Sequence, residues 1–342
     1  MAAGYSSQPG HILLRKQSVL GTFASDIATA GIGIKLRSGS LGTDRTLMIP
    51  DPEIGGGRDI TDSYLGPVKW SGSYDFYARI ESFLSLLYAC MGTTAQVTTT
   101  GITTHTITPS DAAALPYYSV EELIGAGLEC FDYTDTVVNT LHLEAAADGY
   151  LMGTAGLIAL KQVAGITPTD MNTPTALFDS LPMIVGTNVT VTYNGVTLPA
   201  KSFSLDINNN FDDTDFRLGS LYLGSVVPKR REVTASVTIR QQDSALWRQA
   251  VYGTAAATAP GGIPTKQALV INVATYENIV AGTPLTAQQI AFTIPQSILK
   301  PYNFSPSGDD IIEPSIDIQA IRPVPATPIM TSVAKTGRAT IA

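Results

Sequence analysis

The sequence predicts a mainly β chain in which two similar units follow one another, each flanked by a short α-helix. Between residues 67 and 92, and again between 232 and 253, an alternating strand runs into a short amphipathic helix that stops at a glycine. The length of 342 residues is typical of about two domains. Charged residues make up only 15% of the chain, against about 25% in an ordinary soluble domain. The composition therefore indicates a large, weakly charged surface that is buried against other copies.

The first copy begins with a strand whose side chains alternate between apolar and polar types. Val68, Trp70, Tyr74 and Phe76 alternate with polar residues, as expected for a strand with one buried face. Over residues 80–91 the apolar residues recur three and four positions apart, which is typical of one face of a helix. Gly92 can supply the left-handed conformation that ends this helix.

The second copy has the same order of signals. Apolar and polar residues alternate over 233–239, and Asp243 or Ser244 can cap a helix that ends at Gly253. A hairpin accompanies each copy. The first is predicted to turn at Thr134-Asp135 and the second at Asn194-Gly195, with its return strand over 203–207. Asn-Gly between alternating strands is a strong hairpin signal.

The order of these signals divides the chain into five parts. We expect an N-terminal arm and edge hairpin over 1–57, a first unit over 58–165, a linker over 166–180, a second unit over 181–322 and a C-terminal arm over 323–342. The linker contains prolines among threonines, and the last segment has little apolar periodicity. Such an arm packs on a neighbouring chain or stays disordered.

The charge balance argues against a conventional nucleic-acid binder. Lys and Arg number 21 and Asp and Glu 29, a formal net charge of −8, whereas phosphate recognition requires clustered cations. DNA as passing cargo is compatible with this charge, because a neutral or acidic wall lets it slide. No apolar stretch is long enough for a membrane span, and the start does not resemble a secretory signal. We therefore expect assembly in a cytoplasm and no membrane partner.

No set of residues predicts catalysis, a cofactor or a metal site. The loop from Asn208 to Arg217 is rich in oxygen ligands, but it lacks the central glycine and closing glutamate of a calcium loop. The adjacent carboxylates Glu121-Glu122 and Asp309-Asp310 have no visible acid or base partner. Cys90 and Cys130 form no disulfide framework or metal spacing, so we interpret both as small core residues.

The order of features between residues 59 and 160 resembles the tail tube proteins of long, non-contractile-tailed bacteriophages. The resemblance is carried by the strand from Gly66 to Tyr74, the helix that reaches Gly92, and the segments His105–Pro109 and Leu115–Glu121. It covers about a hundred residues clearly and most of the remainder through the second copy.

The resemblance implies a β-sandwich or split barrel flanked by a helix, with subunits that close into rings around a continuous inner β-barrel. Subunits with two units can form a trimeric, pseudo-hexameric ring, so a homotrimer is favoured over a hexamer. Long hairpin loops are expected at ring-to-ring contacts. The candidate inter-ring residues are Asn208, Asn209, Asn210, Asp212, Asp213, Asp215 and Arg217.

The implied function is that of a structural virion protein of a siphophage tail, assembled in the host cytoplasm. Rings would stack into a tube that guides genome DNA during ejection without binding it specifically. The implied partners are further copies of the chain and the tail tip, tape measure and tail terminator proteins. One alternative is a carbohydrate- or receptor-binding β-sandwich, for which Tyr117-Tyr118 is the nearest aromatic pair. Another is a tail-completion protein, and a hydrolase would require a carboxylate pair such as Asp309-Asp310.

Overall fold

The computed structural model describes residues 10–341 except 52, 55–58, 61, 113, 126–128, 170–177, 180, 280–283, 305–307, 309–310 and 325–326. Strands take up 52% of the chain and helices 9%, which confirms a mainly β fold. Within the described residues, eighteen strands form one open sheet. Residues 1–9 of the predicted N-terminal arm, the centre of the predicted linker and Asp309-Asp310 lie outside the described residues.

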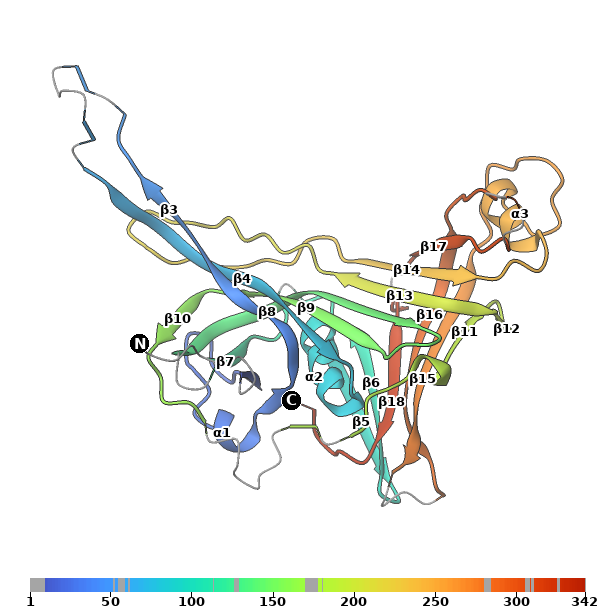
Figure 1. The fold of residues 1–342 in the computed structure, drawn as a ribbon, viewed down its shortest axis with the longest axis horizontal. Helices are drawn as coiled ribbons and strands as arrows, with labels where there is room; N and C mark the ends of the chain where they lie inside the picture. The colour runs from blue at the N-terminus through green and yellow to red at the C-terminus, as the bar shows by residue number, and fades with distance from the viewer. Residues whose placement is uncertain are drawn as a thin grey trace.

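The first half of the chain runs from β1 to β10 (Figure 1). Its elements are β1 (His11–Lys16), α1 (Ile27–Ala30), β2 (Ile32–Ile34), β3 (Leu36–Met48), β4 (Tyr64–Tyr77), α2 (Ile80–Met91), β5 (Gly92–Thr99), β6 (Ile102–Pro109), β7 (Tyr118–Ile124), β8 (Glu129–Ala146), β9 (Met152–Ala159) and β10 (Lys161–Ala164). Antiparallel pairing gives the order β3–β4–β9–β8. The other part of β8 pairs with β7 and β10, and β7 pairs with β1.

The second half repeats this series of pairings. Its elements are η1 (Gly186–Asn188), β11 (Val189–Tyr193), β12 (Val196–Thr197), β13 (Ala200–Asn208), β14 (Glu232–Ile239), α3 (Ala245–Tyr252), β15 (Gln267–Asn278), β16 (Ala287–Leu299), β17 (Ser315–Ala320) and β18 (Thr331–Thr336). The order is β13–β14–β17–β16, and β16 also pairs with β15 and β18. β15 pairs with β11 as β7 pairs with β1. The two halves are joined where β13 pairs with β8 and where β18 pairs with β6.

Helix α2 lies at the centre of the core and has the predicted limits. All of its twelve residues except Glu81 are buried, and Phe83 contacts Phe292 of β16 edge-on, with ring centroids 6.2 Å apart. Gly92 ends the helix with φ 93°. Its counterpart α3 ends at Gly253 with φ 91°, also as predicted, but only Gln249 is buried. None of the helices in the described residues is long and apolar enough to cross a membrane.

Strand β8 corrects one prediction. The turn expected at Thr134-Asp135 is wrong, because β8 is a single strand of 18 residues. Asp135 has φ 58°, and its Oδ1 accepts a hydrogen bond of 2.7 Å from the backbone N–H of Gly21. This local kink lies where β8 leaves β7 and β10 and begins to pair with β9 and β13. The turn-forming residues therefore bend the strand without reversing it.

The second predicted hairpin is confirmed at its turn and wrong beyond it. Asn194 and Gly195 have φ 51° and 76°, as in a type I′ turn, and they connect β11 to β12. Strand β12 contains only two residues. Phe203 and Leu205 lie on β13, which pairs with β8 and β14 instead of β11. The return strand thus ends after two residues, and the chain continues into β13, which lies in another part of the sheet.

The C-terminal segment contains a buried strand where the sequence predicts an arm. β18 pairs with β16 on one side and with β6 on the other. Its inward positions are Ser332, Ala334 and Thr336. Because small and hydroxyl-bearing residues occupy the core face, the strand has no apolar alternation, and the prediction of an arm is wrong for these residues.

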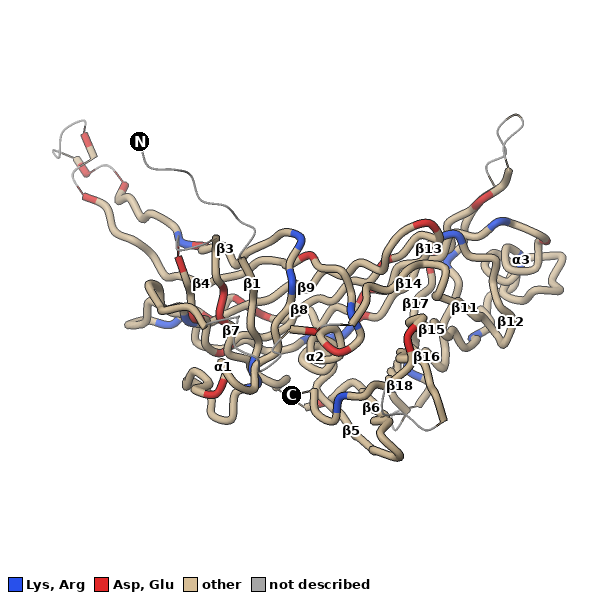
Figure 2. The backbone as a smooth tube through the Cα atoms, turned by 60° about the horizontal axis from the view of Figure 1, so that its bottom comes forward, with Lys and Arg blue, Asp and Glu red and all other residues tan. Residues whose placement is uncertain are grey.

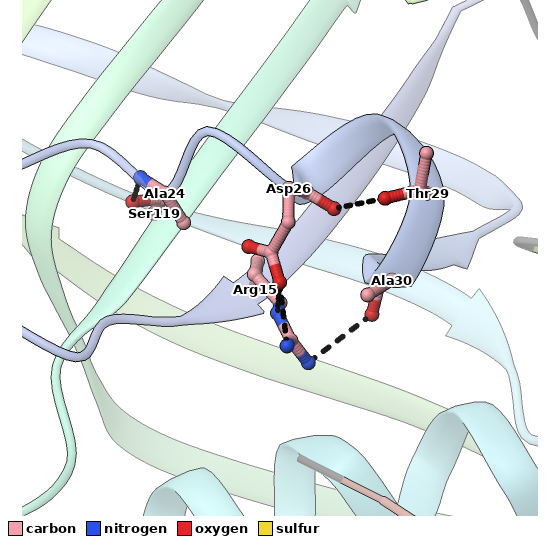
Figure 3. Close-up of polar contacts among 6 residues, drawn as sticks. All are labelled: Arg15, Ala24, Asp26, Thr29, Ala30 and Ser119. Atoms are coloured by element: carbon pink, nitrogen blue, oxygen red, sulfur yellow. Dashed lines mark hydrogen bonds and ion pairs between the residues drawn. The ribbon is translucent and has the colours of Figure 1, made fainter.

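The segment of residues 24–30, which includes α1, packs against β1 and β7 (Figure 3). Arg15 of β1 donates hydrogen bonds of 3.1 and 2.7 Å to Asp26 Oδ2 and one of 3.3 Å to the carbonyl of Ala30 in α1. The backbone N–H of Ala24 donates to Ser119 Oγ of β7 over 2.8 Å. The Arg15 guanidinium lowers the pKa of Asp26. These contacts fix the segment before α1 against β1 and β7.

Three carboxyl groups lie close together on the paired strands β7 and β8, at Glu121, Glu122 and Asp132. Glu121 and Glu122 are buried, and Asp132 lies opposite Glu121 in the β7–β8 pairing. Thr169 donates hydrogen bonds to Glu121 from its backbone N–H and its Oγ1, over 3.0 and 2.9 Å. Burial, followed by the charge of Glu121, raises the pKa of Asp132 to about 6.

This raised pKa predicts a pH-dependent gain from replacing Asp132. Between pH 3.8, the ordinary pKa of an aspartate, and about pH 6, the Asp132 carboxyl is protonated in the folded protein but ionised in the unfolded chain. The protonated carboxyl therefore contributes to the stability of the folded state fully below pH 3.8, and this contribution is lost as the pH rises through 6. We expect Asp132→Asn to raise the free energy of unfolding at pH 8 by about 1–2 kcal/mol and to change little at pH 4. Urea unfolding at both pH values measures this. The exposed Asp148→Asn is the control, and an equal effect of Asp132→Asn at both pH values would contradict the argument.

Candidate assembly surfaces and channel face

A strip of sheet runs through both halves in the order β3–β4–β9–β8–β13–β14–β17–β16. Side chains along it alternate between two faces. One face is apolar and packs into the core around α2. The other carries mostly hydroxyl, amide and carboxylate groups, at Ser71, Ser73, Asp75, Thr140, His142, Glu144, Thr154, Ser202, Ser204, Asp206, Thr234, Ser236, Thr238, Asp317 and Gln319. We call this second surface the polar face.

Hydrogen bonds hold charged groups in place on the polar face. Asp75 accepts bonds of 2.6 Å from Ser38 Oγ and 2.7 Å from Thr154 Oγ1, and these two bonds lower its pKa. It is therefore ionised at neutral pH. The polar face consequently carries fixed negative charge at Asp75 among small hydroxyl groups.

Within the strip, the two halves meet at seven residue pairs between β8 and β13, from Ser202–Ala146 to Asn208–Thr140. His142 bridges this junction, with Nδ1 2.6 Å from Asp206 Oδ1 and Nε2 3.5 Å from Glu144 Oε2. The hydrogen bond to Asp206 raises the pKa of His142. Main-chain pairing and the side chain of His142 thus both join the halves.

The two ends of the strip have open edges. Among the described strands, β3 pairs only with β4, although it is 13 residues long and contains no proline. At the other end, β15 pairs with β16 as far as Ser297, and beyond that residue β16 pairs with β17 on one side. Exposed strand edges of this kind present unpaired N–H and C=O groups to another chain.

The predicted inter-ring residues are spread between buried and exposed positions. Asn208 ends β13, and its Oδ1 accepts from the backbone N–H of Asn210 over 2.8 Å. Asp212 lies 3.1 Å from Lys229, and Asp213 lies 2.7 Å from Lys69 of β4. Asp215 and Arg217 pair over 2.6 Å near the tip of the loop, where the neighbouring Leu218 is fully exposed.

Asn209 differs from its neighbours because it is buried. Its Nδ2 donates to the carbonyls of Cys90 and Val138 over 3.0 and 3.2 Å, and its Oδ1 accepts from Arg231 Nε over 3.0 Å. Arg231 also donates to the carbonyl of Ser110 over 2.8 Å. Asn209 therefore ties the base of the loop to the end of α2 and to β8.

An apolar cluster that the sequence analysis did not identify holds the rest of this loop on the first half. Tyr222 stacks on Trp70 of β4 with ring centroids 6.2 Å apart, and the backbone N–H of Val68 donates to the carbonyl of Leu221 over 2.8 Å. The buried members of the cluster are Leu115, Val137, Ile158, Leu160, Phe211, Leu223 and Val226. Ile158 on the outward side of β9 and Leu160 directly after the strand are apolar, a signal visible in the sequence.

Comparison with known proteins gives a family match. Residues 9–320 match the family described as phage tail tube protein, which is nearly the whole chain. A search of curated proteins gave no match.

Asn209 provides a stability test of this arrangement. Asn209→Ala removes the hydrogen bonds to the carbonyls of Cys90 and Val138 and the one from Arg231. Because these buried groups lose a partner, we expect a loss of about 2–4 kcal/mol in the free energy of unfolding. The exposed ion-pair variant Arg217→Ala should change the free energy of unfolding far less, because solvent screens the pair of Arg217 and Asp215. Equal losses in the two variants, measured by urea unfolding, would show that Asn209 does not anchor the loop.

The match across most of the sequence, together with the mainly β architecture, shows that the chain belongs to the phage tail tube protein family, whose members are structural components of the tail.

Proposed function

We propose that the chain is a tail tube subunit made of two tandem units that assembles into stacked rings. The repeated pairing series β3–β4–β9–β8 and β13–β14–β17–β16 supports the duplication. In this proposal the core of the first unit (58–165) also takes strands from 1–57. The second unit (181–322) also takes β18 from 323–342, and residues 166–180 connect the two.

The junction between β8 and β13 carries the ring proposal. It joins the first unit to the leading strand of the second by main-chain hydrogen bonds. The counterpart of β13 in the first unit is β3, whose outer edge is open, and the counterpart of β8 is β16. Pairing of β3 with the end of β16 beyond Ser297 in another copy repeats the internal junction and covers both open edges.

Three copies would close such a ring with six units. Each copy supplies eight strands to the strip, so a trimer supplies about 24 strands, a wide barrel by the relation between strand number and diameter. A ring of six chains would double that number. The duplication therefore favours a pseudo-hexameric trimer.

The polar face would line the lumen, because the apolar face is committed to the core around α2. Carboxylates such as Asp75, hydroxyl groups and scarce cations give DNA a passage without tight contacts. Such a wall suits a conduit for genome DNA and for the tape measure protein, with tail tip and tail terminator proteins at the two ends of the tube.

Ring-to-ring contacts are assigned to the exposed tip of the loop between β13 and β14. Asp215, Arg217 and Leu218 lie there, while Asn209 and Phe211 hold its base inside the same chain. The tip thus projects from a fixed base, as a stacking contact requires.

Proline substitution in β3 tests ring closure. Successive N–H groups of a strand point to opposite edges, so of Gly42→Pro and Thr43→Pro one removes a hydrogen bond to β4 and the other faces the open edge. The variant with the outward-facing proline should keep the thermal stability of the parent and stay monomeric in sedimentation velocity runs in which the parent forms assemblies. Assembly of both stably folded proline variants would contradict ring closure through β3.

A further inference from the structure

The hairpin of β3 and β4 ends in a projecting arm, which we define as the described residues between Leu47 and Leu65. Figure 1 shows it extending away from the body and from β17 and β18. Large apolar side chains on it are about half exposed or more, at Leu47, Met48, Ile49, Ile60, Tyr64 and Leu65.

The arm is also acidic. Asp51, Glu53, Asp59 and Asp62 lie on it, and Figure 2 shows acidic residues gathered toward its end. A monomer that exposes so many apolar side chains on one projection presents a protein-binding surface.

The equivalent loop in the second half shows where such a projection can pack. The loop of residues 209–231 connects β13 to β14 as the arm connects β3 to β4. It lies on the first half, where Tyr222 stacks on Trp70 and Leu221 accepts a hydrogen bond from Val68. Its apolar side chains Phe211 and Leu223 are buried there. We call the part of the first half that this loop covers the receiving slot.

The corresponding slot in the second half can be located by register. Tyr74 and Phe76 of β4 and Val237 and Ile239 of β14 occupy equivalent buried positions before their helices. Tyr74 pairs with Ala155 of β9, and Val237 pairs with Ile316 of β17.

Arg231 lies six residues before Val237, as Val68 lies six residues before Tyr74. Ile321 lies five residues after Ile316, as Leu160 lies five residues after Ala155. Arg231 and Ile321 are therefore the equivalents of Val68 and Leu160 in the receiving slot. Arg231 and Ile321 line one cavity of about 510 Å³, together with Arg230, Arg322 and Ile329. The loop that fills the slot in the first half thus has no counterpart within the described part of the chain, and a cavity is present at the equivalent place.

The chemistry of the cavity complements the arm. Arg230, Arg231 and Arg322 gather at it with Asp111, and Ile321 and Ile329 provide apolar surface. The arm offers carboxylates next to isoleucine and leucine side chains. Opposite charges around an apolar contact favour association of two chains and fix its register.

We propose that the arm of one copy docks in this cavity of a second copy. The inference rests on the proposed ring, because it makes the docked arm the intermolecular equivalent of the loop that already lies on the receiving slot. Each chain then contributes one arm and one cavity, so the contact is heterologous and closes with the ring.

Photocrosslinking from the arm tests the docking. The full chain is prepared with p-benzoylphenylalanine at Ile60, assembled, irradiated and digested, and the linked peptides are identified by mass spectrometry. The expected products join residue 60 to the segment 319–329 of another copy. The same probe at Ile263, which is exposed next to α3, should give no product with that segment.

Charge exchange provides a second measurement. Arg230 is exposed at the start of β14 and Arg240 at its end, so Arg230→Glu should lower the yield of the Ile60 crosslink about tenfold, a change of about 1.4 kcal/mol in binding. The matched variant Arg240→Glu should leave the yield unchanged. Adding Asp59→Arg to Arg230→Glu should restore it.

The outcomes separate the two proposals. Assemblies that form normally but link residue 60 to other segments, or that keep the crosslink in Arg230→Glu, would overturn the docking and leave the ring proposal standing. Chains that form no assemblies under any condition would overturn both.

Discussion

The structure depends on one constraint, which is that the backbone N–H and C=O groups of long strands need partners on both edges. Strand β8 meets this need by changing partners along its length, from β7 and β10 to β9 and β13. The kink at Asp135 makes the change possible. One strand thereby connects the first half to the second. Among the described strands, the outer edge of β3 and the end of β16 beyond Ser297 have no such partner, and the proposed ring supplies one from a further copy.

The alternation of side chains gives the strip its two roles. Apolar residues on one face pack around α2, which is buried on almost every side, whereas the polar face stays open. Because side chains alternate with a period of two, the polar face gathers small hydroxyl groups and ionised carboxylates such as Asp75 on one side of the sheet. In the proposed ring, this polar face is repeated in every copy.

The sequence predicted the elements that are set by local periodicity. The strand from Val68 to Phe76, the helix over 80–91 and the glycine caps at Gly92 and Gly253 are confirmed, because each has a clear period and a stop signal. Strand β18 was missed because Ser332, Ala334 and Thr336 fill its buried positions. A single sequence indicates burial only through apolar residues.

The path of long-range pairing could not be predicted from local signals. Thr134-Asp135 has turn chemistry but bends a continuous strand, since pairing partners far along the chain hold both of its parts. Asn209 was grouped with a polar surface loop, although its amide satisfies buried carbonyls of Cys90 and Val138. A polar residue gives no sign in sequence that its partners are buried. The resemblance to tail tube proteins, in contrast, rested on the order of elements and is confirmed by the family match.

The central claim is that each chain supplies two equivalent units to a ring, joined within and between chains by the same strand pairing. Electron cryomicroscopy of assembled material, with the rotational symmetry determined from end-on views and the map, tests it most directly. The account predicts rings of three chains with six similar units and a continuous sheet from β3 of one copy to the end of β16 of the next. Rings of six chains, or rings whose sheets stop at each chain boundary, would contradict it.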